Sequence, residues 1–389
     1  MASQRFASNP SRSAALAFAG VLLPAFLALL EGCGNGKVPA ESVARPVIAP
    51  QPVPTAIPAR RTITAVELPD YVGSRRCVSC HRAQSAQLTS HHATTLTSLH
   101  DERVRAPFAA AAAVPDPHRR AQYQPLRAGS TCAIRTVQGD RRMDVKPDYA
   151  FGSGNRCWTY VVWNAGKPFE TRISYYRQIG KWDYTPGQQG KRGAGSPLGR
   201  ALDSAETEEC FLCHSTAVVK EYDQLQPERS IFGVSCESCH GPGREHLAAV
   251  AQKSPDLRMI RFSEHRAQLS QRLCGKCHRD RDSGDPHDPG TAAQLPRLQG
   301  LAMAQSACFK KSGGKLGCVT CHDPHRNASE TTRAAYNATC SSCHQLHATG
   351  QVACSKAPLG DCVSCHMPSQ AVNMPTRPRF RTHWIKVWD

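Results

Sequence analysis

Seven copies of the pattern Cys-x-x-Cys-His constrain this chain more than any other feature of its sequence. Every Cys-x-x-Cys is followed by His, although the chain has only 17 His among 389 residues. Two thiols at this spacing add to the two vinyl groups of one haem, and the adjacent His is delivered to one face of the iron. A zinc-ribbon array is the alternative, but it requires no His after each pair. The sequence therefore predicts seven covalently attached c-type haems.

Each motif contributes two predicted thioether cysteines and one predicted proximal ligand of the iron. The seven sets are Cys77, Cys80 and His81; Cys210, Cys213 and His214; Cys236, Cys239 and His240; Cys274, Cys277 and His278; Cys318, Cys321 and His322; Cys340, Cys343 and His344; and Cys362, Cys365 and His366.

The composition is consistent with cofactors that fill part of the interior. Hydrophobic residues make up 40% and aromatic residues 6%, while Gly and Pro number 28 each. This composition disfavours long helices and large sheets. We therefore expect a mainly α and irregular fold, with short helices and loops wrapped around stacked haems. The net charge of +17 is largely offset by two propionates on each haem, so we expect no nucleic-acid partner.

The sixth position of each iron needs a second ligand. Ten histidines lie outside the motifs and methionines number only six, which favours mostly bis-His, low-potential haems. His325 and His347 each follow a proximal His by three residues, so we expect them to bind a neighbouring haem rather than their own. His92, His246 and His383 are further candidates, and a surface or propionate-bonding role is the alternative for each. The other spare histidines are His91, His100, His118, His265 and His287.

The N-terminal segment predicts export. Residues 1–33 combine a basic start with an uncharged, mostly apolar stretch at residues 14–30, which is short for a membrane span. The stretch ends in Leu-Glu-Gly-Cys33, which resembles a lipoprotein cleavage box, so Cys33 is a predicted acylation site and simple secretion is the alternative. Pro-rich residues 34–70 are typical of an extended tether. We expect the mature protein in the periplasm or at the outer membrane and cell surface, attached to the membrane by a lipid.

The rest of the chain divides by its motifs. Residues 71–129 hold the first haem segment, where residues 82–99 are expected to form one helix that carries His92. Residues 130–200 form a small β-rich insertion, with strands near 131–137, 156–163 and 169–176 and a hairpin turn at 164–167. Residues 201–389 are then a six-haem domain. We expect the insertion to be a packing lid over the haems, and a partner surface is the alternative.

Four cysteines remain after the motifs and Cys33: Cys132, Cys157, Cys308 and Cys354. They allow three pairings, and Cys132 with Cys157 is the natural hypothesis because both lie on strands predicted to be neighbours. Cys308 then pairs with Cys354. Such bridges would stabilise the fold by a few kcal/mol each in an oxidising compartment, and four buried thiols are the alternative.

Several sequence blocks resemble one family of multihaem cytochromes. The blocks are Tyr71-Val-Gly-Ser before the first motif, Ser90-His-His-Ala93, Gly233 to Gly243 with His246, Asp323-Pro-His325, Met367-Pro368 after the last motif, and His383-Trp-Ile. They are similar to the cytochrome c-552/4 domain family, which includes the tetrahaem electron acceptor of hydroxylamine oxidoreductase. The resemblance implies that His92, His246, His325 and His383 are distal ligands.

Electron transfer is the leading functional prediction. Closely spaced, mostly bis-His haems favour a non-catalytic relay between redox partner proteins, for example a quinol oxidase-type donor or other cytochromes. The alternative is an oxidoreductase that acts on a small nitrogen or sulfur compound at one haem with an open position. A structural haem protein is a third hypothesis, but it would not require so many irons.

Overall fold

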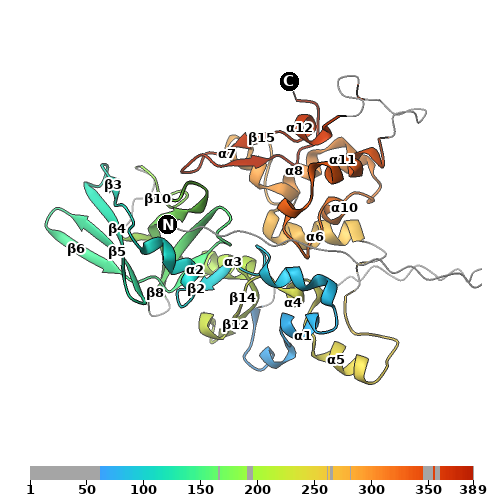
Figure 1. Cartoon of the computed structure of the whole chain (residues 1–389), viewed down its shortest axis with the longest axis horizontal. Helices are drawn as coiled ribbons and strands as arrows, with labels where there is room; N and C mark the ends of the chain where they lie inside the picture. Colours follow the sequence, from blue (N-terminus) through green and yellow to red (C-terminus); the bar gives the residue numbers. More distant parts are fainter. Residues whose placement is uncertain are drawn as a thin grey trace, which may run out of the picture. The chain divides into compact units, whose positions relative to one another are not determined.

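The computed structural model describes residues 62–164, 167–190, 196–260, 262, 266–280, 282–344, 354 and 360–388. All of them belong to one compact unit that spans residues 51–389. Of the described residues, 36% are helical and 24% lie in strands (Figure 1). The predicted export signal, Cys33 and most of the tether lie outside the described residues.

Two antiparallel sheets occupy the region between residues 96 and 201 (Figure 1). The first sheet follows chain order through β3 (Val114–Asp116), β4 (Ala121–Ala128), β5 (Thr131–Gln138) and β6 (Arg141–Val145). The second has the order β10-β9-β8-β7-β2, and β11 also pairs with β9. Its strands are β2 (Leu96–Ser98), β7 (Tyr149–Phe151), β8 (Cys157–Asn164), β9 (Lys167–Tyr176), β10 (Lys181–Tyr184) and β11 (Gly199–Ala201).

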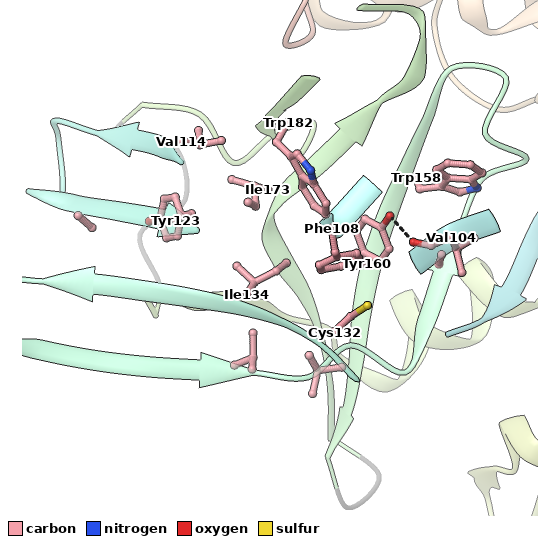
Figure 2. Close-up of a cluster of buried hydrophobic side chains, with 14 residues drawn as sticks. Val104, Phe108, Val114, Tyr123, Cys132, Ile134, Trp158, Tyr160, Ile173 and Trp182 are labelled. Carbon is pink, nitrogen blue, oxygen red and sulfur yellow. Dashed lines mark hydrogen bonds between the residues drawn. The ribbon is translucent and has the colours of Figure 1, made fainter. Parts of the chain in front are cut away.

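One apolar core takes side chains from both sheets (Figure 2). Tyr123 and Ile134 come from the first sheet, and Tyr160 and Trp182 come from the second. The Tyr160 hydroxyl donates to the carbonyl of Val104 at 2.9 Å, so the one polar atom of this ring is satisfied inside the core. Trp158, Tyr160 and Trp182 are thus buried in one shared cluster.

These sheets correct the predicted fold class. A mainly helical chain with a small β insertion is wrong, because strands of the two-sheet region begin well before residue 130 and nearly a quarter of the described residues are in strands. Strand β4 escaped the prediction because its inward side chains are Ala121, Tyr123 and Pro125, which form a weak apolar alternation between glutamines. The hairpin at residues 164–167 is confirmed, since Asn164 of β8 pairs with Lys167 of β9.

A buried carboxylate fixes the edge of the first sheet. Asp116 on β3 accepts hydrogen bonds from the hydroxyl of Tyr123 and from Nη1 of Arg119, each at 3.1 Å. Burial raises the pKa of Asp116, but the hydrogen bonds from these two donors outweigh it and hold the pKa below its usual value. The folded state therefore keeps this carboxylate ionised.

Most helices are short, and seven of them carry or adjoin the Cys-x-x-Cys-His motifs. The motif helices are α1 (Ser74–Val78), α3 (Ser204–His214), α4 (Cys236–His240), α6 (Arg266–His278), α10 (Cys318–Cys321), α11 (Arg333–Ser341) and α12 (Cys362–His366). The other α-helices are α2 (Glu102–Arg105), α5 (Arg244–Ala251), α7 (Pro289–Gln294), α8 (Gln299–Gln305) and α9 (Ala307–Lys311). The 3₁₀ helices span Leu68–Asp70, Arg82–Thr89, Ala106–Phe108, Arg177–Ile179, Pro227–Arg229, Leu295–Arg297 and Ala328–Glu330.

The predicted helix over residues 82–99 is wrong in its extent. A 3₁₀ helix ends at Thr89, and His92 follows in a turn before β2. The Ser90 side chain accepts the N–H of Ala93, and the Thr94 hydroxyl donates to the Ser90 carbonyl. Ser and Thr side chains that bond to nearby backbone in this way compete with a helical ladder, which explains the early end.

Glycines allow the motif helices to approach their neighbours. A Cβ on Gly317, just before α10, would collide with the backbone of Ala267 in α6. A Cβ on Gly300 in the buried helix α8 would likewise collide with the Arg279 carbonyl, just after α6. Helix α6 is therefore held against α8 and α10 by backbone contacts that only glycine permits.

Two smaller sheets complete the unit. Strand β12 (Ser215–Glu221) begins directly after the second motif and pairs with β1 (Thr62–Ile63), β13 (Gln224–Leu225) and β14 (Ile231–Phe232). Strands β15 (Ser369–Ala371) and β16 (Arg379–Arg381) form a hairpin after the last motif. No described helix is long and apolar enough to cross a bilayer.

Candidate functional site

One helical turn presents the reactive groups of each motif. In the first motif the N–H of His81 donates to the carbonyl of Cys77 at 2.9 Å, and His322 and His344 make the same bond to the first Cys of their motifs at 3.0 Å. Positions i, i+3 and i+4 of a helix lie on one face. The two thiols and the imidazole are therefore presented together, as attachment to one cofactor requires.

Four motif histidines face a histidine from a distant part of the chain. The ring centres are 6.3 Å apart for His81 and His246, 6.0 Å for His278 and His92, 6.3 Å for His240 and His325, and 6.1 Å for His322 and His383.

This spacing fits a metal held between the two rings. With a metal–nitrogen bond of about 2.0 Å, and a ring nitrogen about 1.1 Å from its ring centre, two imidazoles on opposite faces have centres about 6 Å apart. Four of the five candidate distal histidines lie in such pairs, and the fifth, His347, lies outside the described residues. The donor set thus matches a six-coordinate iron with two imidazole ligands.

Hydrogen bonds at Nδ1 leave the other ring nitrogen free to bind. Backbone carbonyls lie at 2.8 to 2.9 Å from Nδ1 of His214, His246 and His366, and Asp323 Oδ1 lies at 2.9 Å from Nδ1 of His325. Hydrogen-bond partners also lie at 3.2 to 3.3 Å from Nδ1 of His240, His278, His322 and His383. An Nδ1–H that donates places the lone pair on Nε2 and fixes the ring orientation, as for metal-bound histidines.

Burial keeps several of these rings neutral. Burial is the main cause, and repulsion from neighbouring histidines a smaller one, that together lower the pKa of His92 and of His383 to about 4. Burial also lowers the pKa of His214, His240 and His278. A neutral imidazole is the form that binds a metal, so these sites are ready for ligation at neutral pH.

The motifs lie close to one another. Helices α1 and α4, which carry Cys77 and Cys236, are in contact, and the interaction between the two thiols raises the pKa of Cys77 and lowers that of Cys236 to about 6. The thiols of Cys274 and Cys318 contact in the same way. The Cys277 thiol lies 3.8 Å from the carbonyl of Cys213, and helices α11 and α12 are in contact. Cofactors attached at adjacent motifs are therefore near neighbours.

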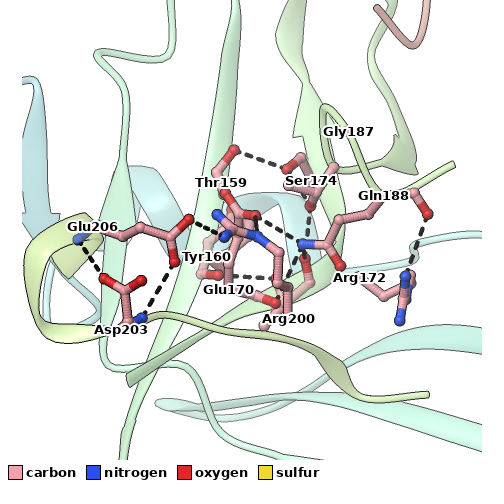
Figure 3. A network of polar contacts seen from close by, with 12 residues as sticks. Thr159, Tyr160, Glu170, Arg172, Ser174, Gly187, Gln188, Arg200, Asp203 and Glu206 are labelled. Carbon is pink, nitrogen blue, oxygen red and sulfur yellow. Dashed lines mark hydrogen bonds and ion pairs between the residues drawn. The ribbon is translucent and has the colours of Figure 1, made fainter. Parts of the chain in front are cut away.

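The second sheet helps to position the second motif. Helix α3 begins with a capping box, in which Asp203 accepts the N–H of Glu206 and Glu206 accepts the N–H of Asp203. Arg200 on β11 pairs with both Glu206 and Glu170, and Gln188 donates to Glu170 at 2.8 Å (Figure 3). Burial raises the pKa of Glu170. This network ties the start of α3 to strands β9 and β11.

The remaining spare histidines have other environments. His100, His118 and His287 are exposed, His91 is half-buried, and His265 lies outside the described residues. Within the described part of the chain, no histidine ring pairs with His214, His344 or His366 at the spacing given above. The ring nearest to His214 among the ring contacts is Phe151 of β7, at 5.3 Å edge-on.

The four other cysteines are free thiols. Cys132 lies on β5 of the first sheet and Cys157 on β8 of the second, so the premise that they occupy neighbouring strands is wrong. Cys308 is half-buried and Cys354 is exposed. Among described residues, no group of three or more His, Cys, Asp and Glu side chains is arranged to hold a metal ion.

Sequence reasoning missed which histidine faces which motif and what orients each ring. Most Nδ1 partners are backbone carbonyls, such as those of Thr95, Leu257 and Lys386, and any residue type supplies a carbonyl. No sequence signal therefore marks them. The hydroxyl of Tyr336, 3.2 Å from Nδ1 of His322, is a side-chain exception four residues before a motif Cys.

Comparisons with known proteins match parts of the chain. The family described as cytochrome c554 and c-prime matches residues 178–241, and the doubled CXXCH motif matches residues 311–349. The C-type polyheme cytochrome OmcB of Geobacter sulfurreducens, in two strains, is 23% identical over 159 residues. That match covers 33% of this chain and 21% of OmcB, so the chain spans about a fifth of the length of these curated relatives. No solved structure matches the chain.

These matches and the motifs support a multihaem c-type cytochrome that binds haem c through Cys-x-x-Cys-His. They do not confirm the predicted relationship to the tetrahaem electron acceptor of hydroxylamine oxidoreductase.

Proposed function

We propose that this chain is a heptahaem c-type cytochrome that carries electrons between redox partners outside the cytoplasm. The observation that carries the proposal is the set of four histidine pairs with ring centres 6.0 to 6.3 Å apart. Each pair joins a motif histidine to a histidine predicted as a distal ligand. Haem iron with two His ligands has no open position for a substrate and is suited to electron transfer.

The histidine pairs also connect motifs that are not consecutive in the chain. His246 follows the third motif but faces His81 of the first, and His325 follows the fifth motif but faces His240 of the third. When a histidine that follows one motif ligates the haem of another, the two haems are held at a fixed position relative to each other. Together with the contacts between motif thiols, this supports transfer between adjacent haems, for which the protein supplies spacing, ligation and burial.

Haem content tests the number of cofactors. We expect a pyridine haemochrome assay to give seven haems for each chain, and intact mass to rise by the mass of seven haems. Colourless protein, or protein that contains zinc in place of iron, would refute the proposal. Changing both cysteines of one motif to alanine should lower the ratio by one.

EPR of the oxidised protein distinguishes a relay from an enzyme. A pure relay gives only low-spin haem. The second candidate function is oxidation or reduction of a small nitrogen or sulfur compound. His214 favours it, because among the described residues its half-buried ring has Phe151 as a neighbour at 5.3 Å and no histidine that faces it. A high-spin fraction near one haem in seven would support the enzyme and call for assays with nitrite, hydroxylamine and tetrathionate.

Export and anchoring belong to the same proposal. A signal segment that ends at Cys33 would place the mature chain in the periplasm or at the cell surface, held by a lipid on Cys33 and a Pro-rich tether. Redox proteins, such as a quinol oxidase-type donor or other cytochromes, would then be its partners. We expect Cys33→Ser to abolish labelling by fatty acid and to release the protein from membranes; unchanged labelling would refute the anchor.

A further inference from the structure

A buried carboxylate joins three segments that carry haem ligands. Glu237 lies between the two cysteines of the third motif, and it is only 3% exposed. Its carboxylate accepts three backbone hydrogen bonds, from the N–H of Val72 at 2.8 Å and from those of Gly73 and Gly243 at 2.9 Å. A buried carboxylate with three N–H donors has its acceptor sites well satisfied.

The three donors precede two different helices. Gly73 is the N-cap of α1, which leads into Cys77 and His81, and Gly243 is the N-cap of α5, which carries His246. The first amides of a helix have no partner within the helix, so the carboxylate satisfies donors that would otherwise be unpaired. Glu237 therefore holds both ends of the His81–His246 pair.

The packing around this carboxylate is tight. A Cβ on Gly243 would lie 2.5 Å from Cγ2 of Val72 and 3.2 Å from Oε1 of Glu237. Gly73 adopts a φ of +80°, which favours glycine. A second tie between the same segments is the ion pair of Arg244 with Asp70, at 3.5 Å. The carboxylate thus sits in a site shaped to receive it.

We propose that Glu237 is a positioning residue that sets both axial ligands of the first-motif haem and places a buried negative charge between the first and third motifs. The inference rests on the proposed ligation by His81 and His246, whose rings are 6.3 Å apart and inclined by 30°. Helix α1, which carries Cys77, is in contact with helix α4, which carries Cys236, so the haems of both motifs would lie near this charge. Oxidised iron carries one more positive charge than reduced iron, so a buried anion stabilises the oxidised form and lowers the reduction potential.

Glu237→Gln tests the charge and one of the hydrogen bonds at nearly constant volume. The amide keeps one carbonyl oxygen, but its NH₂ group cannot accept the N–H of Gly73. In the full haem-loaded chain we expect two midpoint potentials to rise in a spectroelectrochemical titration, and one low-spin EPR signal to change its g values. Glu245→Gln is the matched control, since it removes an exposed carboxylate next to His246, and it should leave potentials and g values unchanged.

Gly243→Ala is the second variant, in case Glu237→Gln fails to mature. It keeps the charge but displaces Val72, so we expect the same EPR signal to change while the potentials shift less than in Glu237→Gln. The inference is wrong if Gly243→Ala, and Glu237→Gln where it matures, match the wild type in EPR and potentials. If the wild type itself lacks low-spin haem with two His ligands, the proposed function fails instead.

Discussion

Replacing Phe211 by alanine should destabilise the unit at the second motif. Phe211 lies between Cys210 and Cys213 on α3 and is 1% exposed. Its ring contacts four aromatic rings at centre distances of 5.2 to 6.3 Å, from Tyr149, Phe151, Trp163 and Phe232. Truncating a buried Phe to Ala costs about 3–5 kcal/mol, since both apolar burial and packing are lost. Because the neighbouring rings come from several strands, the cavity is poorly placed to collapse, and we expect the upper half of that range.

Thermal unfolding of the haem-loaded protein measures this cost. About 4 kcal/mol corresponds to a fall in Tm of roughly 8–16 °C for a domain of moderate size, and less for a larger unit. Phe211→Leu keeps most of the volume and should cost about 1–2 kcal/mol. Tyr222→Ala is the control, because this aromatic side chain is 100% exposed at the turn between β12 and β13. A loss below about 1 kcal/mol in Phe211→Ala would refute the packing argument.

Three further predictions follow from single side chains. Asp116→Asn should lower the free energy of unfolding by about 1–3 kcal/mol at neutral pH. Because the pKa of Asp116 is lowered in the folded state, the wild-type carboxylate stabilises the fold above its unfolded pKa of about 3.9, and this contribution is lost as the pH falls. The acid unfolding curves of the two proteins should therefore converge. Gly317→Ala should separate α10 from the backbone of Ala267 and lower Tm, and an unchanged Tm would contradict the close approach. His325→Ala should convert one haem to a high-spin EPR signal while the exposed His287→Ala does not, and identical spectra would exclude His325 as a ligand.

Sequence patterns were informative where chemistry or a hydrophobic period marks a residue. The seven motifs follow from covalent spacing, and the hairpin between β8 and β9 follows from aromatic and β-branched strands around Asn164 and Lys167. Strand β4 was missed because its buried side chains are Ala, Tyr and Pro, and large aliphatic residues are not among its three inward positions near the start of the strand. The helix expected to carry His92 ends early because the side chains of Ser90 and Thr94 bond to nearby backbone.

The histidine pairs could be predicted only as sets of candidates. His92, His246, His325 and His383 were recognisable as candidate ligands, but the partner of each depends on contacts between segments far apart in the chain. His92 faces His278, which lies after two intervening motifs. Sequence spacing has no information on such a pairing, because it depends on contacts between distant segments, such as the hydrogen bond from the Val234 N–H to the His92 carbonyl.

The exchange of histidines between motifs has a consequence for biogenesis. An emerging polypeptide presents His81 long before His246, and it presents His322 about 60 residues before His383. Under the proposed ligation, haems joined to the early motifs would wait for their second imidazole until later segments had crossed the membrane. Chains whose synthesis stopped before residue 383 would then carry a five-coordinate haem that can bind other ligands. The maturation machinery would therefore have to shield this haem until the second histidine arrives.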